Sequence, residues 1–349
     1  MGAATSKPSA SAKDVERKVT ILIAYRKDND HMRHHARKLC ERMPNAAELE
    51  VDVSYFACGN PRIVIRDPDA STQTSYTIVL LTDWSNERKN PGLAECVLAK
   101  SLAKKPWCAK LVVIPPFFAE STCDREVPLG PNHNEVPYGI VFADIFSTVL
   151  ENVTFVMTDL HAMQMENYLT RNHCVQIKAE GMRSLLARCV ANAANARVVF
   201  ADEGALKRFE ATVRQVLPDC RVSYCVKRKV SADQRTCTIH HVDAEDDDAN
   251  MADEIVFVID DIIRSGKSLT DCANECVACG AKDIRVLATH GAFPDDSFVQ
   301  FMQANQGAIA SCSLMDTHEN AVRAAAFAPH FYKVYDMAPV YASIAAAYA

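Results

Sequence analysis

Short apolar segments alternate with amphipathic helical segments along the chain, and this alternation constrains the fold more than any other feature. Strands buried on both faces are apolar throughout, and helices between them act as the crossovers of a parallel sheet. The sequence therefore predicts an α/β fold with mostly parallel sheets flanked by helices. In the first half we expect strands at 19–25, 76–83, 110–118 and 153–161, a strand pair at 48–56 and 61–65, and helices at 31–43, 92–105 and 138–150.

The second half repeats this order of elements. A chain of 349 residues is long for a single core, so two domains are favoured. The repeated order predicts a duplication, with an N-terminal domain at 18–165 and a C-terminal domain at 166–334. We expect residues 335–349 to form a helix that packs back on the first domain. Expected strands are 196–202, 221–227, 236–243, 253–261, 283–291 and 310–316, and expected helices are 180–193, 204–216, 296–306 and one that begins at Leu269.

Composition narrows the class of protein. The formal charge of −6 gives no basic field for nucleic acid. No apolar run approaches the length that a membrane span needs, and no secretory signal opens the sequence. These features favour a cytoplasmic location with reduced cysteines. Residues 1–17 are rich in Ser and Ala and are expected to be disordered. They also fit the N-myristoylation pattern, with Gly2 after Met1 and Ser6 at the required spacing, so a weak membrane attachment stays open.

The segment VFVIDDIIRSGKSL, Val256 to Leu269, carries the main functional signal. A Walker A motif is excluded because it needs Gly where Asp261 stands. What remains is an apolar strand that ends in two carboxylates, followed by a polar turn and a helix. Backbone N–H groups at such a helix start bind phosphate, and Arg264 and Lys267 add positive charge. The carboxylates at the carboxyl edge of the sheet suit the hydroxyls of a sugar attached to that phosphate.

This segment resembles the phosphoribosyl diphosphate (PRPP) motif of the type I phosphoribosyltransferase superfamily. Other segments are similar to the ribose-phosphate pyrophosphokinases, also called PRPP synthases. The resemblance covers nearly the whole chain after residue 17 and is stronger in the second half. The segments that carry it are VMTDLHAMQMENYL from Val156, VVFADEGALKRF from Val198, VKRKVSADQ from Val226, VLATHGAF from Val286, SLMDT from Ser313 and DMAPVYASIAAAY from Asp336.

The resemblance implies transfer of diphosphate from ATP to ribose 5-phosphate, with Mg²⁺ as cofactor. It also implies assembly into dimers or hexamers, with itself or with paralogues. The implied catalytic residues are Lys227 and Lys229. The implied metal ligands are His161 and Asp202, and the implied ATP-binding residues are His161, Gln164 and Asp124. Ribose 5-phosphate is expected at Asp260, Asp261, Arg264, Ser265, Gly266, Lys267 and Ser268.

Departures from the family pattern fall mainly on the ATP side. Cys58 and Asn60 stand where the family has two acids, and Thr122 and Cys123 stand where it has Arg and Gln. Three functions therefore remain open. The first is an active PRPP synthase with a divergent ATP pocket. The second is a non-catalytic subunit that binds sugar phosphate and joins active paralogues. The third is a salvage phosphoribosyltransferase, which the duplication disfavours.

Two side-chain clusters have a simpler interpretation. Cys272, Cys276 and Cys279 recur on one helical face and are expected to pack in the core. The histidines at 31, 34 and 35 are expected on a solvated helix, because a zinc site needs further ligands.

Overall fold

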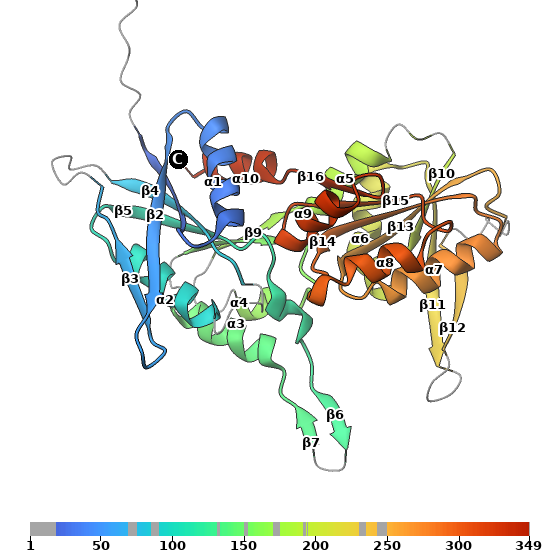
Figure 1. Ribbon diagram of the computed structural model, residues 1–349, viewed down its shortest axis with the longest axis horizontal. Coiled ribbons are helices and arrows are strands. Elements are labelled where there is room, and N and C mark those ends of the chain that lie inside the picture. Colours follow the sequence, from blue (N-terminus) through green and yellow to red (C-terminus); the bar gives the residue numbers. More distant parts are fainter. Residues whose placement is uncertain are drawn as a thin grey trace, which may run out of the picture.

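The computed structural model describes residues 19–68, 75–84, 91–130, 133–149, 153–169, 175–190, 193, 195–229, 235–242 and 250–348. The predicted tail and the Gly2 acylation pattern lie outside these residues. The chain forms two seven-stranded sheets flanked by helices (Figure 1), which confirms the predicted α/β class. Within the described residues, no helix has the length and apolar character that crossing a membrane requires.

The first sheet has the strand order β3-β2-β1-β4-β5-β8-β9. All neighbours are parallel except the edge hairpin β2–β3. Its strands are β1 (Ile21–Arg26), β2 (Ala46–Tyr55), β3 (Pro61–Ile65), β4 (Tyr76–Leu81), β5 (Cys108–Ile114), β8 (Thr154–Thr158) and β9 (Val175–Ala179). Its helices are α1 (Asp30–Arg42), α2 (Pro91–Ala103), α3 (Tyr138–Val149) and α4 (Met165–Leu169), with a 3₁₀ turn η1 (Ala119–Thr122) and a small hairpin of β6 (Val127–Gly130) and β7 (His133–Glu135).

The second sheet repeats this order as β12-β11-β10-β13-β14-β15-β16. Again only the edge hairpin, β11–β12, is antiparallel. The strands are β10 (Ala196–Phe200), β11 (Arg221–Lys229), β12 (Arg235–His241), β13 (Ile255–Ile263), β14 (Asp283–Gly291), β15 (Ser311–Met315) and β16 (Tyr332–Tyr335). The helices are α5 (Gly181–Cys189), α6 (Glu203–Val216), α7 (Lys267–Ala278), α8 (Phe298–Ala304), α9 (Glu319–Phe327) and α10 (Ala338–Ala346), with a 3₁₀ turn η2 (Pro294–Asp296).

The equal strand orders agree with a duplication, but the first sheet extends further than expected. β9 belongs to the first sheet, so this sheet continues to Ala179, past the boundary expected at residue 165. Short strands such as β9 and β16 give little periodic signal, and they were not foreseen. The central strands β1, β4 and β8 are buried along their whole length, as predicted for strands covered on both faces.

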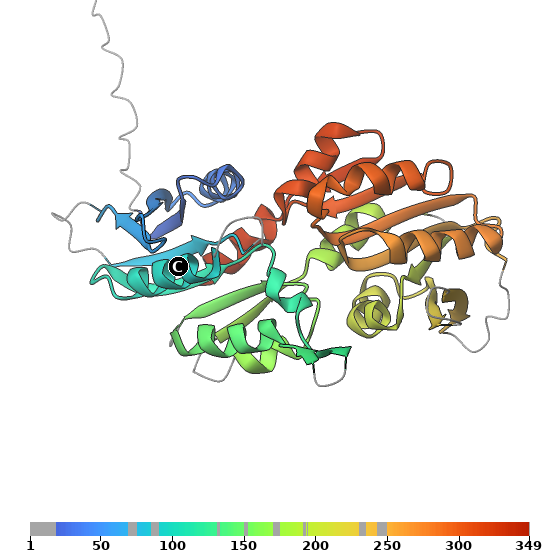
Figure 2. The same ribbon diagram turned by 60° about the horizontal axis from the view of Figure 1, so that its bottom comes forward.

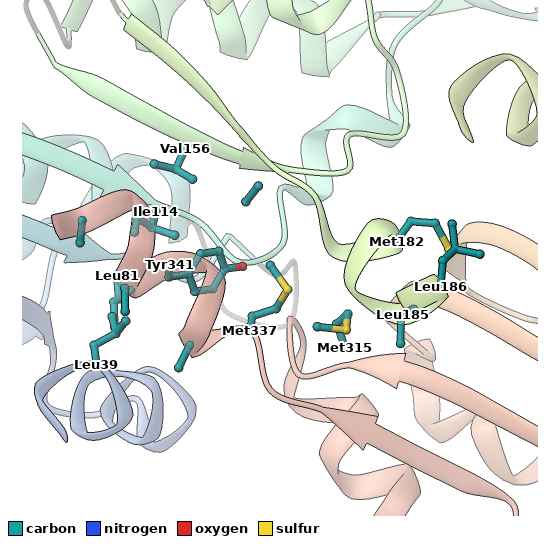
Figure 3. Close-up of a cluster of buried hydrophobic side chains, with 14 of the residues drawn as sticks. Leu39, Leu81, Ile114, Val156, Met182, Leu185, Leu186, Met315, Met337 and Tyr341 are labelled. Atoms are coloured by element: carbon teal, nitrogen blue, oxygen red, sulfur yellow. The ribbon is translucent and has the colours of Figure 1, made fainter. Parts of the chain in front are cut away.

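One apolar core runs through both domains. It joins Ile23 of β1 and Leu39 of α1 to Leu185 of α5 and Phe257 of β13. Helix α10 provides much of the connection: it packs against α1, and Met337 and Tyr341 are fully buried between the two sheets (Figure 3). Figure 2 shows α10, in red, beside the strands of the first sheet.

Two histidines of α1, His31 and His35, contradict the expectation of a solvated helix, whereas His34 is exposed as expected. His35 is fully buried, and Nε2 of both His31 and His35 lies within 3.0 Å of the carbonyl oxygen of Asp316. The helix face that carries them is covered by the second domain, which the sequence of α1 alone does not reveal. The expected packing of cysteines on α7 is confirmed for Cys272 and Cys276, which are both fully buried.

Candidate functional site

A cleft of about 830 Å³ lies between the two domains, at the carboxyl ends of the strands of the second sheet. A cavity of about 630 Å³ at the opposite edge of that sheet contains none of the predicted site residues. The cleft brings together predicted residues that lie far apart in the sequence. Those that line it are Asp124, His161, Gln164, Asp202, Asp260, Asp261, Arg264, Ser265, Gly266, Lys267 and Ser268.

The turn before α7 is shaped to receive an anion. Gly266 precedes the first residue of the helix and has a φ of +73°, a conformation that favours glycine. A Cβ at this position would also come within 2.1 Å of Phe301 Cδ2. The side chains of Arg264 and Lys267 are exposed beside the helix N-terminus. The backbone N–H groups of the first helical turn, the helix dipole and two cations therefore act at one place.

Asp260 and Asp261 lie near the carboxyl end of β13 but have different surroundings. Asp260 is half-buried, and burial together with the negative charges of Asp261 and Asp202 raises its pKa well above the ordinary value. Asp261 is buried, which alone would raise its pKa. The hydrogen bond from His161 and the charge of Arg208 instead hold the pKa of Asp261 below the usual value.

His161 and Arg208 reach Asp261 from different elements. His161 follows β8 in the first domain, and its Nδ1 lies 2.9 Å from Asp261 Oδ2. Arg208, on α6, places Nη1 2.6 Å from Asp261 Oδ1 and donates from Nη2 to the carbonyl oxygen of His161. The hydrogen bond to Asp261 raises the pKa of His161. These contacts connect the two domains at the floor of the cleft.

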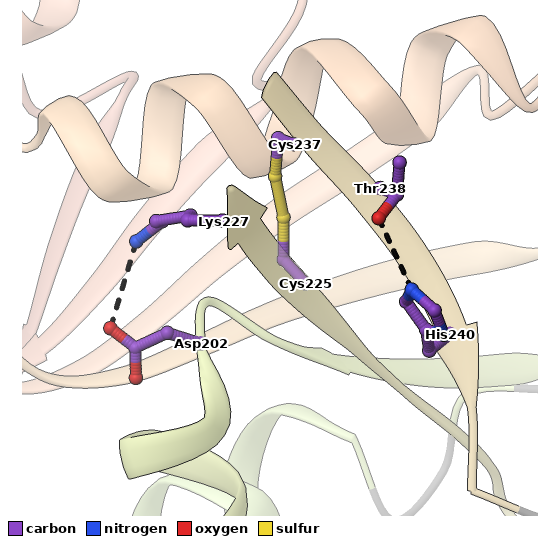
Figure 4. Close-up of a disulfide and its surroundings, with 6 residues drawn as sticks. All are labelled: Asp202, Cys225, Lys227, Cys237, Thr238 and His240. Carbon is purple, nitrogen blue, oxygen red and sulfur yellow. Dashed lines mark hydrogen bonds and ion pairs between the residues drawn. A yellow bond between two sulfur atoms is a disulfide. The ribbon is translucent and has the colours of Figure 1, made fainter. Parts of the chain in front are cut away.

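Lys227, in the β11–β12 hairpin, points toward Asp202, which lines the cleft (Figure 4). Its Nζ lies 3.6 Å from Oδ2 of Asp202, the N-cap residue of α6. Pairing between β10 and β11 ends at Tyr224, so the part of β11 that carries Lys227 pairs only with β12. The side chain of Lys229, the other predicted catalytic lysine, lies outside the described residues.

A disulfide between Cys225 and Cys237 joins the two strands of this hairpin near Lys227 (Figure 4). The expectation that the cysteines are all reduced is therefore wrong for this pair. Their Cα atoms are 6.2 Å apart, within the range that a disulfide spans. The composition could not reveal this pair, because it depends on the register of β11 against β12.

Only some of the residues on the predicted ATP side meet at the cleft. Gln164 Nε2 donates to Asp124 Oδ2 at 2.6 Å, so two predicted residues meet at the cleft. Thr122 and Cys123 also line it. Cys58 and Asn60 are exposed at the turn between β2 and β3, and they do not line the cleft.

Comparisons with known proteins agree with the predicted fold and family resemblance. No family model matches the chain. It is 26% identical over 207 residues to ribose-phosphate pyrophosphokinase 4 of Oryza sativa subsp. japonica, covering 58% of each chain. It is 25% identical over 278 residues to ribose-phosphate pyrophosphokinase 4 of Arabidopsis thaliana, covering 78% of this chain and 76% of that protein. A solved phosphoribosylpyrophosphate synthetase from Mycobacterium smegmatis has the same fold, with a TM-score of 0.71 at 16% identity, over 94% of this chain and 98% of that one.

These relatives are ribose-phosphate pyrophosphokinases, which confirms the predicted resemblance to that family. The chain spans about half of the length of the first relatives it matches, 58% of the rice protein and 47% of the chloroplastic ribose-phosphate pyrophosphokinase 3 of Arabidopsis thaliana.

The family resemblance implies magnesium as a cofactor. The donors at the cleft fit this ion only together with the phosphates of a substrate. The described residues contain no group of three or more His, Cys, Asp or Glu side chains that could hold a metal ion by themselves. Asp202 and Asp260 do supply carboxylates, and His161 is 41% exposed at the same place. Mg²⁺ is commonly held by one or two carboxylates together with substrate phosphates. This donor set therefore suits a magnesium ion bound with a nucleotide.

Several residues at the domain contact were not foreseen. Arg208 lies in the family-like segment from Val198, but the resemblance assigns it no role. Asp159 has a φ of +34°, and its Oδ2 accepts hydrogen bonds from Thr289 Oγ1 and the Met182 backbone N–H. Burial raises the pKa of Asp159 to about 6, and burial lowers the pKa of His290 to about 4. The contacts of Asp159 with Thr289 and of His290 with Thr158 each join residues more than 100 positions apart, so no local pattern indicates them.

Proposed function

We propose that the protein is a PRPP synthase, which transfers diphosphate from ATP to the 1-hydroxyl of ribose 5-phosphate and releases AMP. One observation carries the proposal: an anion-binding turn and an acidic pair line a single interdomain cleft, and Lys227 forms an ion pair with Asp202, which also lines it. The relatives named ribose-phosphate pyrophosphokinase support the same class of reaction.

The residues of the second domain would hold the sugar phosphate. The backbone N–H groups at the start of α7, with Arg264 and Lys267, would bind the 5-phosphate. Asp260 would accept hydrogen bonds from the ribose hydroxyls and so hold the sugar at the carboxyl end of β13. A sugar fixed at both points keeps its 1-hydroxyl in one orientation toward the nucleotide, which removes much of the entropic barrier to reaction.

The remaining residues would act on the diphosphate. Lys227 would neutralise negative charge that develops as the diphosphate leaves AMP. Its ion pair with Asp202 holds the ammonium group at the cleft before substrates bind. Magnesium, held by Asp202 and His161 when it is bound with ATP, would supply further charge neutralisation. Gln164 and Asp124 would contact the nucleotide from the first domain.

A non-catalytic subunit is the alternative, and one observation favours it. Thr122 and Cys123 line the cleft where the family resemblance implies Arg and Gln. Loss of a cation and an amide removes bonds of about 1–3 kcal/mol each. We therefore expect ribose 5-phosphate to bind more tightly than Mg-ATP. In either case we propose a cytoplasmic location. We also propose that the protein assembles with itself or with paralogues. Light scattering of the purified protein, alone and co-expressed with a paralogue, measures this assembly.

A coupled assay of AMP release from Mg-ATP decides between the two functions. The synthase predicts AMP release that requires ribose 5-phosphate and falls at least a hundredfold in Lys227→Ala. The matched control is Lys282→Ala, since Lys282 is exposed and does not line the cleft. Binding of ribose 5-phosphate without any AMP release would establish the non-catalytic alternative. Absence of both would reject the two proposals together.

A further inference from the structure

The hairpin of β11 and β12 extends beyond the rest of the second sheet, and Lys227 lies on this part (Figure 1). β11 pairs with β10 only as far as Tyr224. Within the residues that the structure describes, 225–229 of β11 pair with 235–239 of β12 alone, and we call these two segments the hairpin extension. Two strands without a third neighbour are only marginally stable in water. The position of Lys227 therefore depends on how firmly β11 is held to β12.

The disulfide lies at the point where the hairpin extension begins. Cys225 is the first residue after the last pair between β11 and β10. Cys237 is opposite Lys227 in the register of the hairpin, and Cys225 is opposite Ile239, so the disulfide joins the strands diagonally (Figure 4). A covalent link between two strands prevents them from slipping or separating, because it limits the alternative conformations of the chain between its ends. The disulfide therefore also restrains the backbone that carries Lys227.

Two non-covalent contacts also hold the hairpin extension. β12 packs against α7, and both cysteines of the disulfide contribute to the apolar cluster that includes Cys272 of α7. Lys227 Nζ lies 3.6 Å from Asp202 Oδ2, and the side chain of Asp202 is 43% exposed. An ion pair with an exposed carboxylate contributes little to stability. The disulfide is thus the strongest single restraint on the part of the hairpin that presents Lys227.

The two sulfur atoms of the disulfide differ in their access to solvent. Cys225 is fully buried, whereas Cys237 is half-buried. A thiolate from solution therefore reaches Cys237 first, forms a mixed disulfide there and releases Cys225 as a thiolate. The neighbouring Cys272 and Cys276 are fully buried, and their hydrogen bond together with burial raises the pKa of the Cys272 thiol well above its usual value. A protonated thiol is a poor nucleophile, so Cys272 does not compete for the disulfide.

We propose that Cys225 and Cys237 are a site of reversible thiol–disulfide exchange, through which a dithiol reductant controls whether Lys227 is held at the cleft. The dithiol supplies two electrons and two protons: its two thiols become a disulfide, the bond between Cys225 and Cys237 breaks, and both cysteines become thiols. A disulfide in a cytoplasmic protein, the location proposed above, is commonly of this reversible kind.

Reduction leaves Lys227 on two strands that are no longer linked covalently, so the oxidised protein is the more active form. This consequence rests on the proposed function, because it uses Lys227 as the residue that stabilises the transferring diphosphate.

Hydrogen exchange compares the two redox states without any substrate. One sample is kept in oxidised dithiothreitol and the other in the reduced dithiol, and free thiols are alkylated and counted by mass spectrometry in parallel samples. Reduction should add two alkylated cysteines and speed the exchange of the β12 peptide (Arg235–His241) about tenfold or more, while the β14 peptide (Asp283–Gly291) should change little. An equal thiol count in the two samples, or equal exchange of β12, would overturn the inference.

AMP release then relates this site to the reaction. Reduction is expected to lower kcat about tenfold or more and to change the KM of ribose 5-phosphate less than about threefold, because Lys227 acts on the diphosphate and not on the sugar. Cys237→Ser should have the low kcat in both samples. The matched control is Cys220→Ser, which changes a free, half-buried cysteine outside the cleft and should respond to reduction as the wild type does.

An unchanged or higher kcat in the reduced wild type would contradict the proposed control of Lys227. If neither sample releases AMP, the proposed function fails, whereas the thiol count and the exchange of β12 still decide whether the cysteine pair is a redox site that restrains the hairpin extension.

Discussion

Removal of the Lys267 ammonium group should weaken the binding of ribose 5-phosphate specifically. Lys267 is the first residue of α7 and is exposed at the cleft. A hydrogen bond between charged groups contributes about 1.5–3 kcal/mol, and exposure to solvent places Lys267 at the low end. Lys267→Ala is therefore expected to raise the Kd by about tenfold, since about 1.4 kcal/mol corresponds to a factor of ten. The backbone donors of the turn remain, so binding should weaken rather than vanish.

Calorimetry at two salt concentrations measures this effect. Added salt should narrow the difference between the wild type and Lys267→Ala, because the lost interaction is between exposed charges. Lys282→Ala, which removes an exposed lysine outside the cleft, is the matched control and should leave the Kd unchanged. An unchanged Kd in Lys267→Ala, or an equal loss in Lys282→Ala, would show that the phosphate does not bind at the start of α7.

Three further outcomes concern stability. Gly266→Ala should destabilise the fold by about 1–3 kcal/mol in urea, because the left-handed backbone and the contact with Phe301 both oppose a Cβ. Burial raises the pKa of Glu120 from 4.5 to about 7. Between these values the folded state keeps a proton that the unfolded chain has released, so stability falls as pH rises through this window. Glu120→Gln should therefore stabilise the protein by up to about 3 kcal/mol at pH 8 and hardly at all at pH 4. The control variant Glu126→Gln, at an exposed position, should leave the stability unchanged at both pH values. Tyr341→Ala should lower the free energy of unfolding by about 3–5 kcal/mol. Because the core around Tyr341 includes both domains, the unfolding transitions followed by fluorescence and by circular dichroism should still coincide.

The phosphate turn could be predicted from the sequence because its parts are contiguous. Strand, carboxylates, Gly266 and the start of α7 lie within one short segment, and local geometry alone places them together. The α/β class followed in the same way from the alternation of apolar and helical segments.

Contacts between distant segments could not be predicted from local patterns. Arg208 and Asp261 are 53 residues apart, and their ion pair requires α6 and β13 to meet at the cleft. The disulfide between Cys225 and Cys237 requires one particular register of an antiparallel hairpin. His35 has the pattern of a surface residue until the second domain covers it. Tertiary packing supplies the information in each case.

The position of α10 in the sequence has a consequence for synthesis of the protein. Domains usually fold in order as they leave the ribosome, with the N-terminal one first. Here the first sheet ends at Ala179, but the helix that covers part of it begins at Ala338, after the whole second sheet. During translation, the apolar surface of the first domain that α10 covers therefore stays exposed until α10 has been synthesised. Chaperones that bind such surfaces should associate longest with nascent chains that end between these two points.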